Sequence, residues 1–357
     1  MTKAKQWINP GVLAMHAYKV PDASGLIKLD AMENPYTWPD ELKQKWLHGL
    51  SKLEINRYPD AHARSLKDKI RQVMKIPDEL SIMLGNGSDE LILIIALAMA
   101  QANRVFLAPE PSFVMYEAIS TMTNTRYECV SLNASDFSLD VEKMLTAINK
   151  YQPAVIFLAY PNNPSGNLFD EQVITEIVKN APGLVVLDEA YHVFSGKSLM
   201  GRLPEFNNCI LMRTFSKSGL AGLRLGYLTG PPDWINEMEK IRLPYNINSL
   251  SQMTAEFILD NNQILEQQAE RICNNREVLF NEISSIDGIT VWPSAANFIL
   301  FKIHNKDADK VFNQLKEQGL LIKNLNNQHA MLSNCLRVTV GTEIENAVFI
   351  KALKNCL

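Results

Sequence analysis

The feature that most constrains the fold of this chain is an alternation of short apolar runs with helical patterns between residues 81 and 228. The apolar runs lie at 81–84, 104–107, 126–132, 154–158, 184–187, 209–213 and 225–228, with helical patterns between most of them. This alternation predicts an α/β fold with a mostly parallel central sheet flanked by helices on both faces. Ligands of such sheets bind at the carboxyl ends of the strands, so candidate site residues are sought there.

The remainder of the chain divides around this region. Residues 1–40 are proline-rich and are expected to form an irregular N-terminal arm. We expect a large α/β domain over residues 41–245 and a smaller α+β domain over 246–357. The smaller domain is expected to begin with one long helix over residues 251–286, followed by short strands and two further helices.

Composition excludes several classes of function. The net charge of −4 provides no basic surface for nucleic acid. The five cysteines are scattered without CxxC spacing and the six histidines form no HExxH motif, which argues against a disulfide framework or a metal site. The longest apolar run, 91–100, is too short to span a bilayer. No apolar stretch follows the first lysines, so we expect a soluble, cytoplasmic protein without a membrane partner.

A glycine-containing turn follows the first strand of the alternating region. Gly85–Glu90 contains Gly87, Ser88 and Asp89 directly before a helical pattern. Glycines and a helix N-terminus together favour binding of a phosphate, to which Ser88 adds a hydroxyl. A plain helix cap by Ser88 or Asp89 explains the same residues. The turn is not a Walker loop, because no GK[ST] follows it.

Two further strand ends carry polar residues. Asn163 lies in the turn-like segment 160–166, where its amide can donate to a ligand. Asp188 directly follows the apolar run 184–187, and a carboxylate there is costly unless it has a partner. A protonated pyridine nitrogen is one suitable partner, and a helix cap or a protein cation is the alternative.

The last two strand ends carry cationic side chains. Lys217 lies among small residues after the run 209–213, a setting in which Schiff-base chemistry is plausible. Ser216 and Arg224 in the same loop suit a phosphate. Arg337 lies within an apolar strand and is expected to bind an anion, either a protein carboxylate or a substrate. A lysine in a loop, considered by itself, is usually only solvated.

Pyridoxal phosphate (PLP) is the ligand that matches these groups jointly. It requires a phosphate site, a nucleophilic lysine, a carboxylate for its ring nitrogen and donors for its phenolate oxygen. Lys217 supplies the nucleophilic lysine and Asp188 the carboxylate. Asn163 and Tyr191 supply the donors for the phenolate oxygen. Phe113 is placed to stack on the ring.

The order of these motifs resembles the fold-type I PLP-dependent aminotransferases of class I/II over nearly the whole chain. The motifs are NPSG at 163–166, DEAY at 188–191, SKSGLAGLR at 216–224 and CLRVTVGT at 335–342. Within that group the chain is most similar to the histidinol-phosphate aminotransferases, through segments 29–36, 57–59, 244–248 and 296–298. The loop from Lys217 to Arg224 is one residue shorter than in many members, and Lys323 stands where some members have arginine.

The resemblance implies a role for each matching residue. Lys217 is the catalytic residue that holds PLP as a Schiff base and moves the substrate proton. The other implied cofactor-binding residues are Asp188, Tyr191, Asn163, Ser216, Arg224, Gly87, Ser88, Asp89 and Phe113. Tyr58 is implied to reach the cofactor phosphate of the neighbouring subunit, so the enzyme is expected to be a homodimer. The implied substrate-binding residues are Arg337, Tyr18, Lys323 and Asn34.

The implied activity is transfer of the amino group of L-histidinol phosphate to 2-oxoglutarate by ping-pong chemistry in histidine biosynthesis. The products are imidazole acetol phosphate and L-glutamate. Two alternatives share the cofactor residues: an aromatic amino acid aminotransferase and a PLP-dependent decarboxylase of phosphothreonine. A PLP-binding regulatory module without turnover is an alternative from another class, although residues 1–40 are too short for a DNA-binding domain. A nucleotide-binding protein using Gly85–Glu90 leaves Lys217 and Asp188 unexplained.

Overall fold

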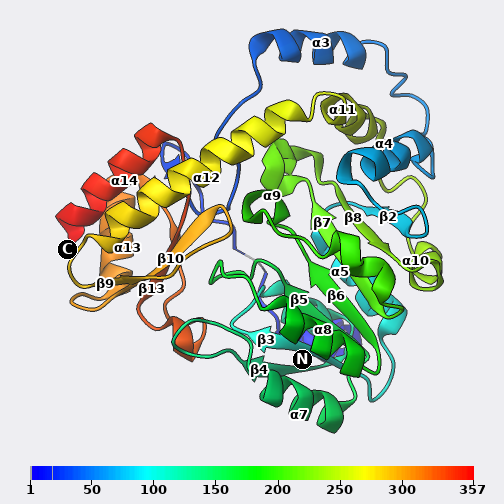
Figure 1. The fold of residues 1–357 in the computed structure, drawn as a ribbon, viewed down its shortest axis with the longest axis horizontal. Helices are drawn as coiled ribbons and strands as arrows, with labels where there is room; N and C mark the ends of the chain where they lie inside the picture. The colour runs from blue at the N-terminus through cyan, green and yellow to red at the C-terminus, as the bar shows by residue number, and fades with distance from the viewer. Residues whose placement is uncertain (1, 18) are drawn as a thin grey trace.

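The larger part of the molecule is built on one twisted sheet. The computed structural model describes residues 2–17 and 19–357. In these residues the sheet has seven strands in the order β2-β8-β7-β6-β5-β3-β4 (Figure 1). Their bounds are β2 Ser81–Gly85, β3 Val105–Glu110, β4 Arg126–Ser131, β5 Val155–Ala159, β6 Leu184–Asp188, β7 Cys209–Thr214 and β8 Gly226–Gly230. Strands β4, β3, β5, β6 and β7 are parallel, and β8 is antiparallel to both β7 and β2. The expected mostly parallel sheet is confirmed.

Both faces of this sheet are buried, which explains why its strands read as continuous apolar runs. In β6, Leu184 and Val186 pack into one core cluster, whereas Val185 and Leu187 pack into another on the opposite face. The first cluster is covered by α5 Ser88–Met99, α6 Met115–Met122 and α10 Pro232–Glu239. The second is covered by α4 Arg64–Met74, α7 Val141–Tyr151 and α8 Glu171–Asn180.

The smaller part is an antiparallel sheet covered by helices. Its strand order is β12-β13-β10-β9, with bounds β9 Ile289–Val291, β10 Phe298–Ile303, β12 Lys323–Asn324 and β13 Cys335–Thr339. Helices α13 Ala308–Glu317 and α14 Glu343–Cys356 pack with it, and α14 begins with a capping box formed by Thr342 and Glu345. A short strand of the arm, β1 Ile27–Lys28, pairs with β11 Leu320–Leu321, so the end of the arm is part of this sheet region.

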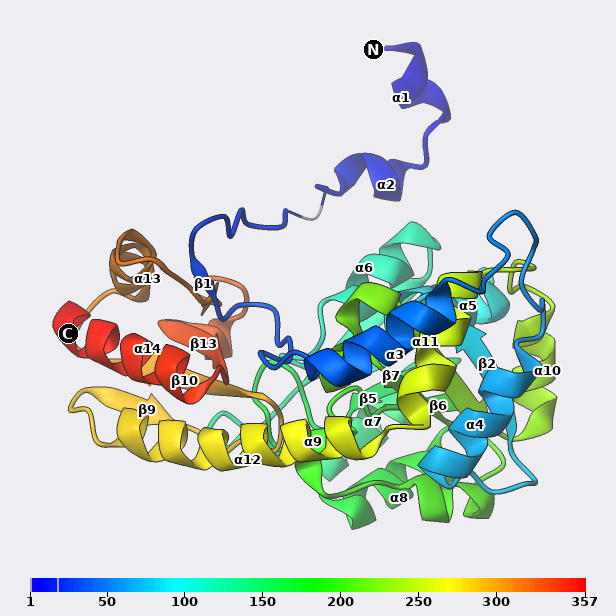
Figure 2. The same ribbon diagram turned by 90° about the horizontal axis from the view of Figure 1, so that it is seen from above.

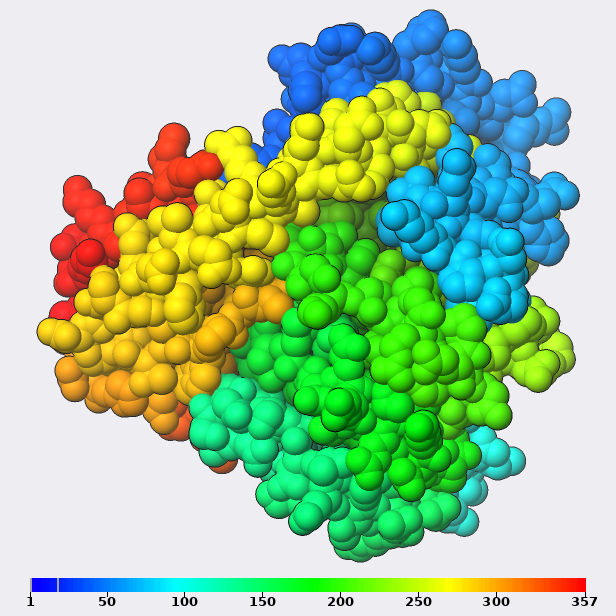
Figure 3. Space-filling model, in the orientation of Figure 1, coloured from blue at the N-terminus to red at the C-terminus, as the bar shows by residue number. Residues whose placement is uncertain are grey.

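One long helix joins the two parts. Helix α12, Gln263–Ser284, forms a continuous ridge on the surface from the smaller part to the larger part (Figure 3). The prediction of a single helix over residues 251–286 is wrong, because α11 Ser249–Leu259 and α12 are separate helices. Asp260, Asn261 and Asn262 lie between them, and such residues favour turns over helix interiors.

The N-terminal arm contains more structure than expected. It forms two short helices, α1 Lys3–Trp7 and α2 Pro10–Ala14, and α2 lies against α6 (Figure 2). The side chain of Asn9 accepts a hydrogen bond from the Gly11 amide, and Pro10 occupies the first helical position, so α2 has a regular start signal. Helix α10, which was missed in the sequence, also has a proline, Pro232, at its first position, but its N-cap Pro231 makes no side-chain hydrogen bond.

Packing suggests where the chain divides. Helix α11 packs against α4 and against α3, Asp40–Leu50, so it belongs with the larger sheet. We propose an arm, a large α/β domain and a small α+β domain, with the large domain extended from residue 245 to the turn at 260–262. The described residues contain no helix that is long and apolar enough to cross a membrane.

Candidate active site

The carboxyl ends of the strands surround one pocket. Its volume is about 110 Å³, and it lies where β5, β6 and β7 end and α5 begins. The predicted residues that line it are Ser88, Asp89, Phe113, Asn163, Asp188, Tyr191, Ser216, Lys217 and Arg224. These residues span more than 130 positions of the chain, and the parallel sheet brings them to one edge.

Lys217 lies in the turn that follows β7. Its ammonium nitrogen Nζ donates a hydrogen bond to the carbonyl oxygen of Ala31 at 3.1 Å. Burial, and next the positive charge of Arg337, lower the pKa of Lys217 to about 8. An amine with such a pKa is partly neutral near physiological pH, which is the form that reacts with carbonyl groups and accepts protons.

Asp188 is the last residue of β6, and its side chain is buried. Its Oδ2 atom accepts a hydrogen bond from the hydroxyl of Tyr116 at 2.7 Å, and its Oδ1 atom accepts one from the amide of Ala190 at 3.1 Å. Burial raises the pKa of Asp188 to about 6, although both hydrogen bonds act in the opposite direction. The carboxylate is therefore held in place, and in residues 2–17 and 19–357 no cation offsets its burial.

The carboxylate that follows Asp188 points elsewhere. Glu189 is fully buried, and its Oε2 atom forms an ion pair with Nη2 of Arg213 at 2.7 Å. Its Oε1 atom accepts a hydrogen bond from the amide of Leu199 at 2.8 Å. This pairing anchors the segment between β6 and α9, His192–Ser195, so that Asp188 and Tyr191 remain directed at the pocket.

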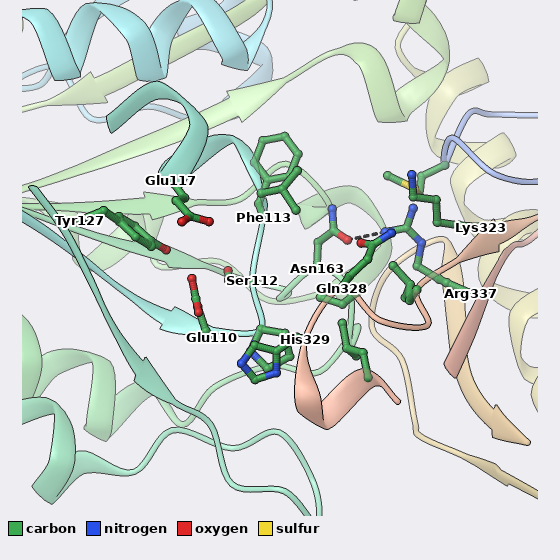
Figure 4. A pocket seen from close by; sticks show the side chains of 16 residues that line it. Glu110, Ser112, Phe113, Glu117, Tyr127, Asn163, Lys323, Gln328, His329 and Arg337 are labelled. Carbon is green, nitrogen blue, oxygen red and sulfur yellow. Dashed lines mark hydrogen bonds between the residues drawn. The ribbon is translucent and has the colours of Figure 1, made fainter. Parts of the chain in front are cut away.

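A chain of hydrogen bonds links the two halves of the site. Nδ2 of Asn163 donates to the hydroxyl of Tyr191 at 3.2 Å, and Oδ1 of Asn163 accepts a short hydrogen bond from Nη1 of Arg337 (Figure 4). Nη2 of Arg337 donates to the carbonyl oxygen of Asp30 at 3.2 Å. Burial raises the pKa of Tyr191, so its hydroxyl stays protonated and can donate to an anionic ligand oxygen.

The turn before α5 and the loop after Lys217 form an anion site. Nη1 of Arg224 lies 3.3 Å from Oγ of Ser216, and its Nη2 lies 3.4 Å from Oδ2 of Asp89. Gly87 has φ +85°, and a Cβ atom added there would lie 2.6 Å from Nη2 of Arg224. Gly87 is therefore required by its backbone conformation, and a larger residue there would also displace the end of the Arg224 side chain. The amides at the start of α5 and this guanidinium suit a phosphate.

A family model for class I and II aminotransferases matches residues 24–353. The chain belongs to this family. A protein named histidinol-phosphate aminotransferase 2 from Nitrosococcus oceani is 52% identical over 356 residues, covering 99% of both chains. One named histidinol-phosphate aminotransferase 1 from Ralstonia nicotianae is 47% identical, covering 97% of this chain and 93% of its own.

Solved structures show the same fold. The crystal structure of histidinol-phosphate aminotransferase from Sinorhizobium meliloti, in complex with pyridoxal 5′-phosphate, has a TM-score of 0.87 and 22% identity. It covers 98% of this chain and 97% of its own. The enzyme of the same name from Clostridium acetobutylicum has a TM-score of 0.85 and 23% identity, with coverage of 92% and 98%. Both comparisons show that the larger and smaller parts of this chain together form the same fold as these two enzymes.

The residues in the pocket of this class I and II aminotransferase fit PLP chemically. The buried Asp188 carboxylate, with its raised pKa, is suited to the protonated ring nitrogen. The Asn163 and Tyr191 pair offers hydrogen bonds to an anionic ring oxygen. Lys217 offers an amine with a lowered pKa on the same pocket. A bound cofactor would offset the cost of burying the charged forms of Asp188 and Lys217.

A second, larger cavity adjoins this pocket. Its volume is about 300 Å³, and it shares Met32, Phe113 and Asn163 with the first pocket. Lys323 and Arg337 both line it, so these two predicted substrate residues are brought together (Figure 4). Burial, and next the charge of Arg337, lower the pKa of Lys323. Two adjacent cations in a partly buried cavity favour an anionic ligand group.

The other predicted residues are not brought to either cavity in the described chain. Nδ2 of Asn34 donates to Oε1 of Gln268 at 2.8 Å and to the carbonyl oxygen of Ser218 at 3.4 Å. Asn34 therefore contacts the backbone of the loop that carries Lys217. Tyr58 is 80% exposed and stacks on Tyr245 with ring centroids 4.4 Å apart. Tyr18 lies outside the residues that the structure describes.

Sequence reasoning missed the hydrogen-bond donor to Asp188. Tyr116 is fully buried in α6, and its ring stacks on Phe157 with centroids 4.6 Å apart. In the sequence it resembles any core aromatic residue of a helix. Its closeness in sequence to Phe113 is the only signal that pointed to the site; Phe113 lies before α6, and the two rings contact each other with centroids 5.6 Å apart.

Proposed function

We propose that this class I and II aminotransferase transfers the amino group of L-histidinol phosphate to 2-oxoglutarate, with PLP as cofactor. The products are imidazole acetol phosphate and L-glutamate. The observation that carries the proposal is that Lys217 and Asp188 line one pocket, while the adjoining cavity holds the Arg337 and Lys323 cations. The names of the relatives at 47% and 52% identity support this donor.

The cofactor would be held by groups already in place. Lys217 would bind it covalently, Asp188 would pair with its ring nitrogen, and Asn163 with Tyr191 would bind its ring oxygen. Ser88, Ser216 and Arg224, together with the Gly87 turn and Asp89, would form the phosphate site, and Phe113 would cover the ring face. When bound, PLP supplies an electron-withdrawing ring that stabilises negative charge at the substrate α-carbon.

Proton transfer is the task of Lys217. With the donor bound, the Lys217 amine would remove the proton of the substrate α-carbon as a general base. Its pKa of about 8 keeps both the neutral and the protonated form accessible near neutral pH, so the same group can return the proton. Arg337 and Lys323 hold the anionic end of the substrate, which fixes the α-carbon relative to Lys217.

An aromatic amino acid aminotransferase and a phosphothreonine decarboxylase would use the same cofactor groups. A coupled assay with histidinol phosphate and 2-oxoglutarate, with phenylalanine as a competing donor, separates the two transaminases. Release of carbon dioxide from phosphothreonine identifies the decarboxylase. Lys217→Ala should abolish turnover and the visible absorbance of the bound cofactor. Normal activity in Lys217→Ala would overturn the proposal.

The proposed assembly is a homodimer in which Tyr58 reaches the phosphate site of the neighbouring subunit. The exposed stack of Tyr58 on Tyr245 supports this, together with the exposed apolar residues Leu243 and Leu250 nearby in sequence. Light scattering after gel filtration tests the dimer, and Tyr58→Phe should weaken cofactor retention without changing the mass of the dimer.

All five cysteines are free, which suits a reducing compartment, and we propose a cytoplasmic location.

A further inference from the structure

The larger cavity has two ends of opposite charge (Figure 4). It opens onto the Lys217 pocket through Phe113 and Asn163, which line both. Arg337 and Lys323 line one end. A substrate that reacts at Lys217 therefore has its anionic group at the cationic end, and its remaining substituent is left to extend towards the opposite end.

The opposite end is formed by Glu110, Glu117 and Tyr127, here called the acidic wall. Glu110 ends β3, Tyr127 lies on the neighbouring strand β4, and Glu117 lies on α6. Figure 4 shows the two carboxylates and the phenol directed towards one space, beyond Phe113 and away from Arg337. Burial, and next the charge of Glu110, raise the pKa of Tyr127. Its hydroxyl therefore stays protonated and donates a hydrogen bond to the Glu110 carboxylate.

We propose that the acidic wall binds the nitrogen-bearing ring of the amine donor and thereby selects an imidazole over a phenyl ring. This inference rests on the proposed function. Carboxylates accept hydrogen bonds from ring N–H groups and favour the protonated ring, while Phe113 offers an aromatic face at the entrance. A phenyl ring in the same place has no N–H group, so Glu110 keeps only its partners Tyr127 and Cys129 and the donor gains no hydrogen bond from the acidic wall.

The acidic wall has an opposite effect on the amino-group acceptor. 2-Oxoglutarate carries two carboxylates, and when one lies at the cationic end the other extends towards Glu110 and Glu117. Like charges repel each other, so the acidic wall disfavours this second carboxylate. Removal of one wall carboxylate should therefore weaken binding of the imidazole donor but not of the acceptor, and a general disruption of the cavity would weaken both.

The test uses the purified PLP-loaded enzyme and its Glu110→Gln variant. Apparent dissociation constants for histidinol phosphate and for phenylalaninol phosphate are obtained from the dependence of the rate of the donor half-reaction on donor concentration, followed by cofactor absorbance without acceptor. We expect Glu110→Gln to raise the constant for histidinol phosphate about tenfold or more, and to change that for phenylalaninol phosphate by less than about twofold. The KM for 2-oxoglutarate should stay constant or fall.

Two further variants make the comparison specific. Glu117→Gln should act in the same direction but more weakly, because Glu117 is more exposed. Glu128→Gln is the matched control: Glu128 follows Tyr127 on β4, pairs with Arg126 and does not line the cavity. This variant also removes one negative charge, at the position next to Tyr127 on β4. It should leave the apparent dissociation constants of both donors unchanged.

The outcomes separate this inference from the proposed function. A wild-type enzyme that reacts with histidinol phosphate, combined with a Glu110→Gln variant that weakens both donors equally or neither, overturns the role of the acidic wall alone. A wild-type enzyme that does not react with histidinol phosphate but reacts with phenylalanine contradicts the proposed function and the inference with it. Opposite shifts for donor and acceptor support the inference.

Discussion

The hydroxyl of Tyr116 donates a hydrogen bond to Oδ2 of Asp188 at 2.7 Å, deep inside the molecule. Both residues are almost completely buried, and Tyr116 is fixed by its stacking on Phe157. The bond fixes the carboxylate and favours its ionised form, which is the form that pairs with a protonated ring nitrogen. Tyr116 therefore acts on the cofactor site through Asp188 and is a positioning residue.

Tyr116→Phe is predicted to move the acid limb of the pH–activity profile to higher pH. Loss of the hydroxyl removes a group that lowers the pKa of Asp188, so the carboxylate becomes protonated at a higher pH than in the wild type. At neutral pH we expect kcat to fall by about tenfold or more, because loss of one hydrogen bond to a charged group is worth roughly 1.5–3 kcal/mol. The loss should shrink as the pH rises.

Tyr160→Phe is the control for this substitution. Tyr160 is equally buried, and its hydroxyl approaches Oε1 of Glu171 at 3.3 Å rather than a group of the pocket. Its removal should leave the acid limb in place. A Tyr116→Phe enzyme with the wild-type profile would show that the bond does not influence Asp188 during turnover.

Asp188 should also make the cofactor-free protein less stable as the pH rises. Its pKa is raised in the folded state, so the contribution to stability is present below the unfolded pKa near 4 and is lost as the pH rises through about 6. The shift from 3.8 to about 6 corresponds to about 3 kcal/mol. The unfolding free energies of cofactor-free wild type and Asp188→Asn, measured in urea, should diverge between about pH 4 and pH 6 and stay apart above that, with the variant relatively more stable at pH 8. Parallel pH dependence in both proteins would contradict this.

Most of the chemistry of the pocket could be predicted from the sequence because it follows strand ends. Asn163, Asp188 and Lys217 each lie at the end of a buried strand or within four residues of it, and a parallel sheet brings such positions to one edge. The pattern of the runs was sufficient to identify the sheet, although the antiparallel direction of β8 was not visible in it. Direction depends on the connection between strands, here the short loop 215–225.

Other features depend on tertiary packing and were not predictable. Tyr116 and Tyr127 have no local pattern that separates them from core aromatic residues, and only the folded chain places them at Asp188 and Glu110. Asn34 was assigned to the substrate by resemblance, but the structure places it on Gln268. The break at 260–262 was a local signal, three turn-forming residues in succession, that the surrounding helical pattern concealed.

Arg337 is predicted to determine the affinity for both substrates. Nη1 of Arg337 bonds to Asn163 and Nη2 to the Asp30 carbonyl, so its planar guanidinium is oriented along the cavity beside Lys323. Arg337→Lys keeps the charge but loses the fork geometry, and we expect KM for histidinol phosphate and for 2-oxoglutarate to rise by about tenfold or more. The cofactor absorbance should persist, since the lysine loop is intact. A rise for only one substrate would show that the other binds elsewhere.

Gly87→Ala is predicted to weaken retention of the cofactor more than it weakens the fold. The new methyl group would lie 2.6 Å from Nη2 of Arg224, and alanine at φ +85° is strained by roughly 1–3 kcal/mol. Since Gly87 precedes α5 and Arg224 faces it, both sides of the phosphate site are displaced together. We expect the dissociation constant of PLP to rise by about tenfold or more, measured by equilibrium dialysis at low phosphate.

Gly222→Ala is the matched control, because that glycine lies two residues before Arg224, has no positive φ and has open space around its added methyl group. If both variants lose the cofactor equally, the loop as a whole, rather than the contact between Gly87 and Arg224, governs phosphate binding.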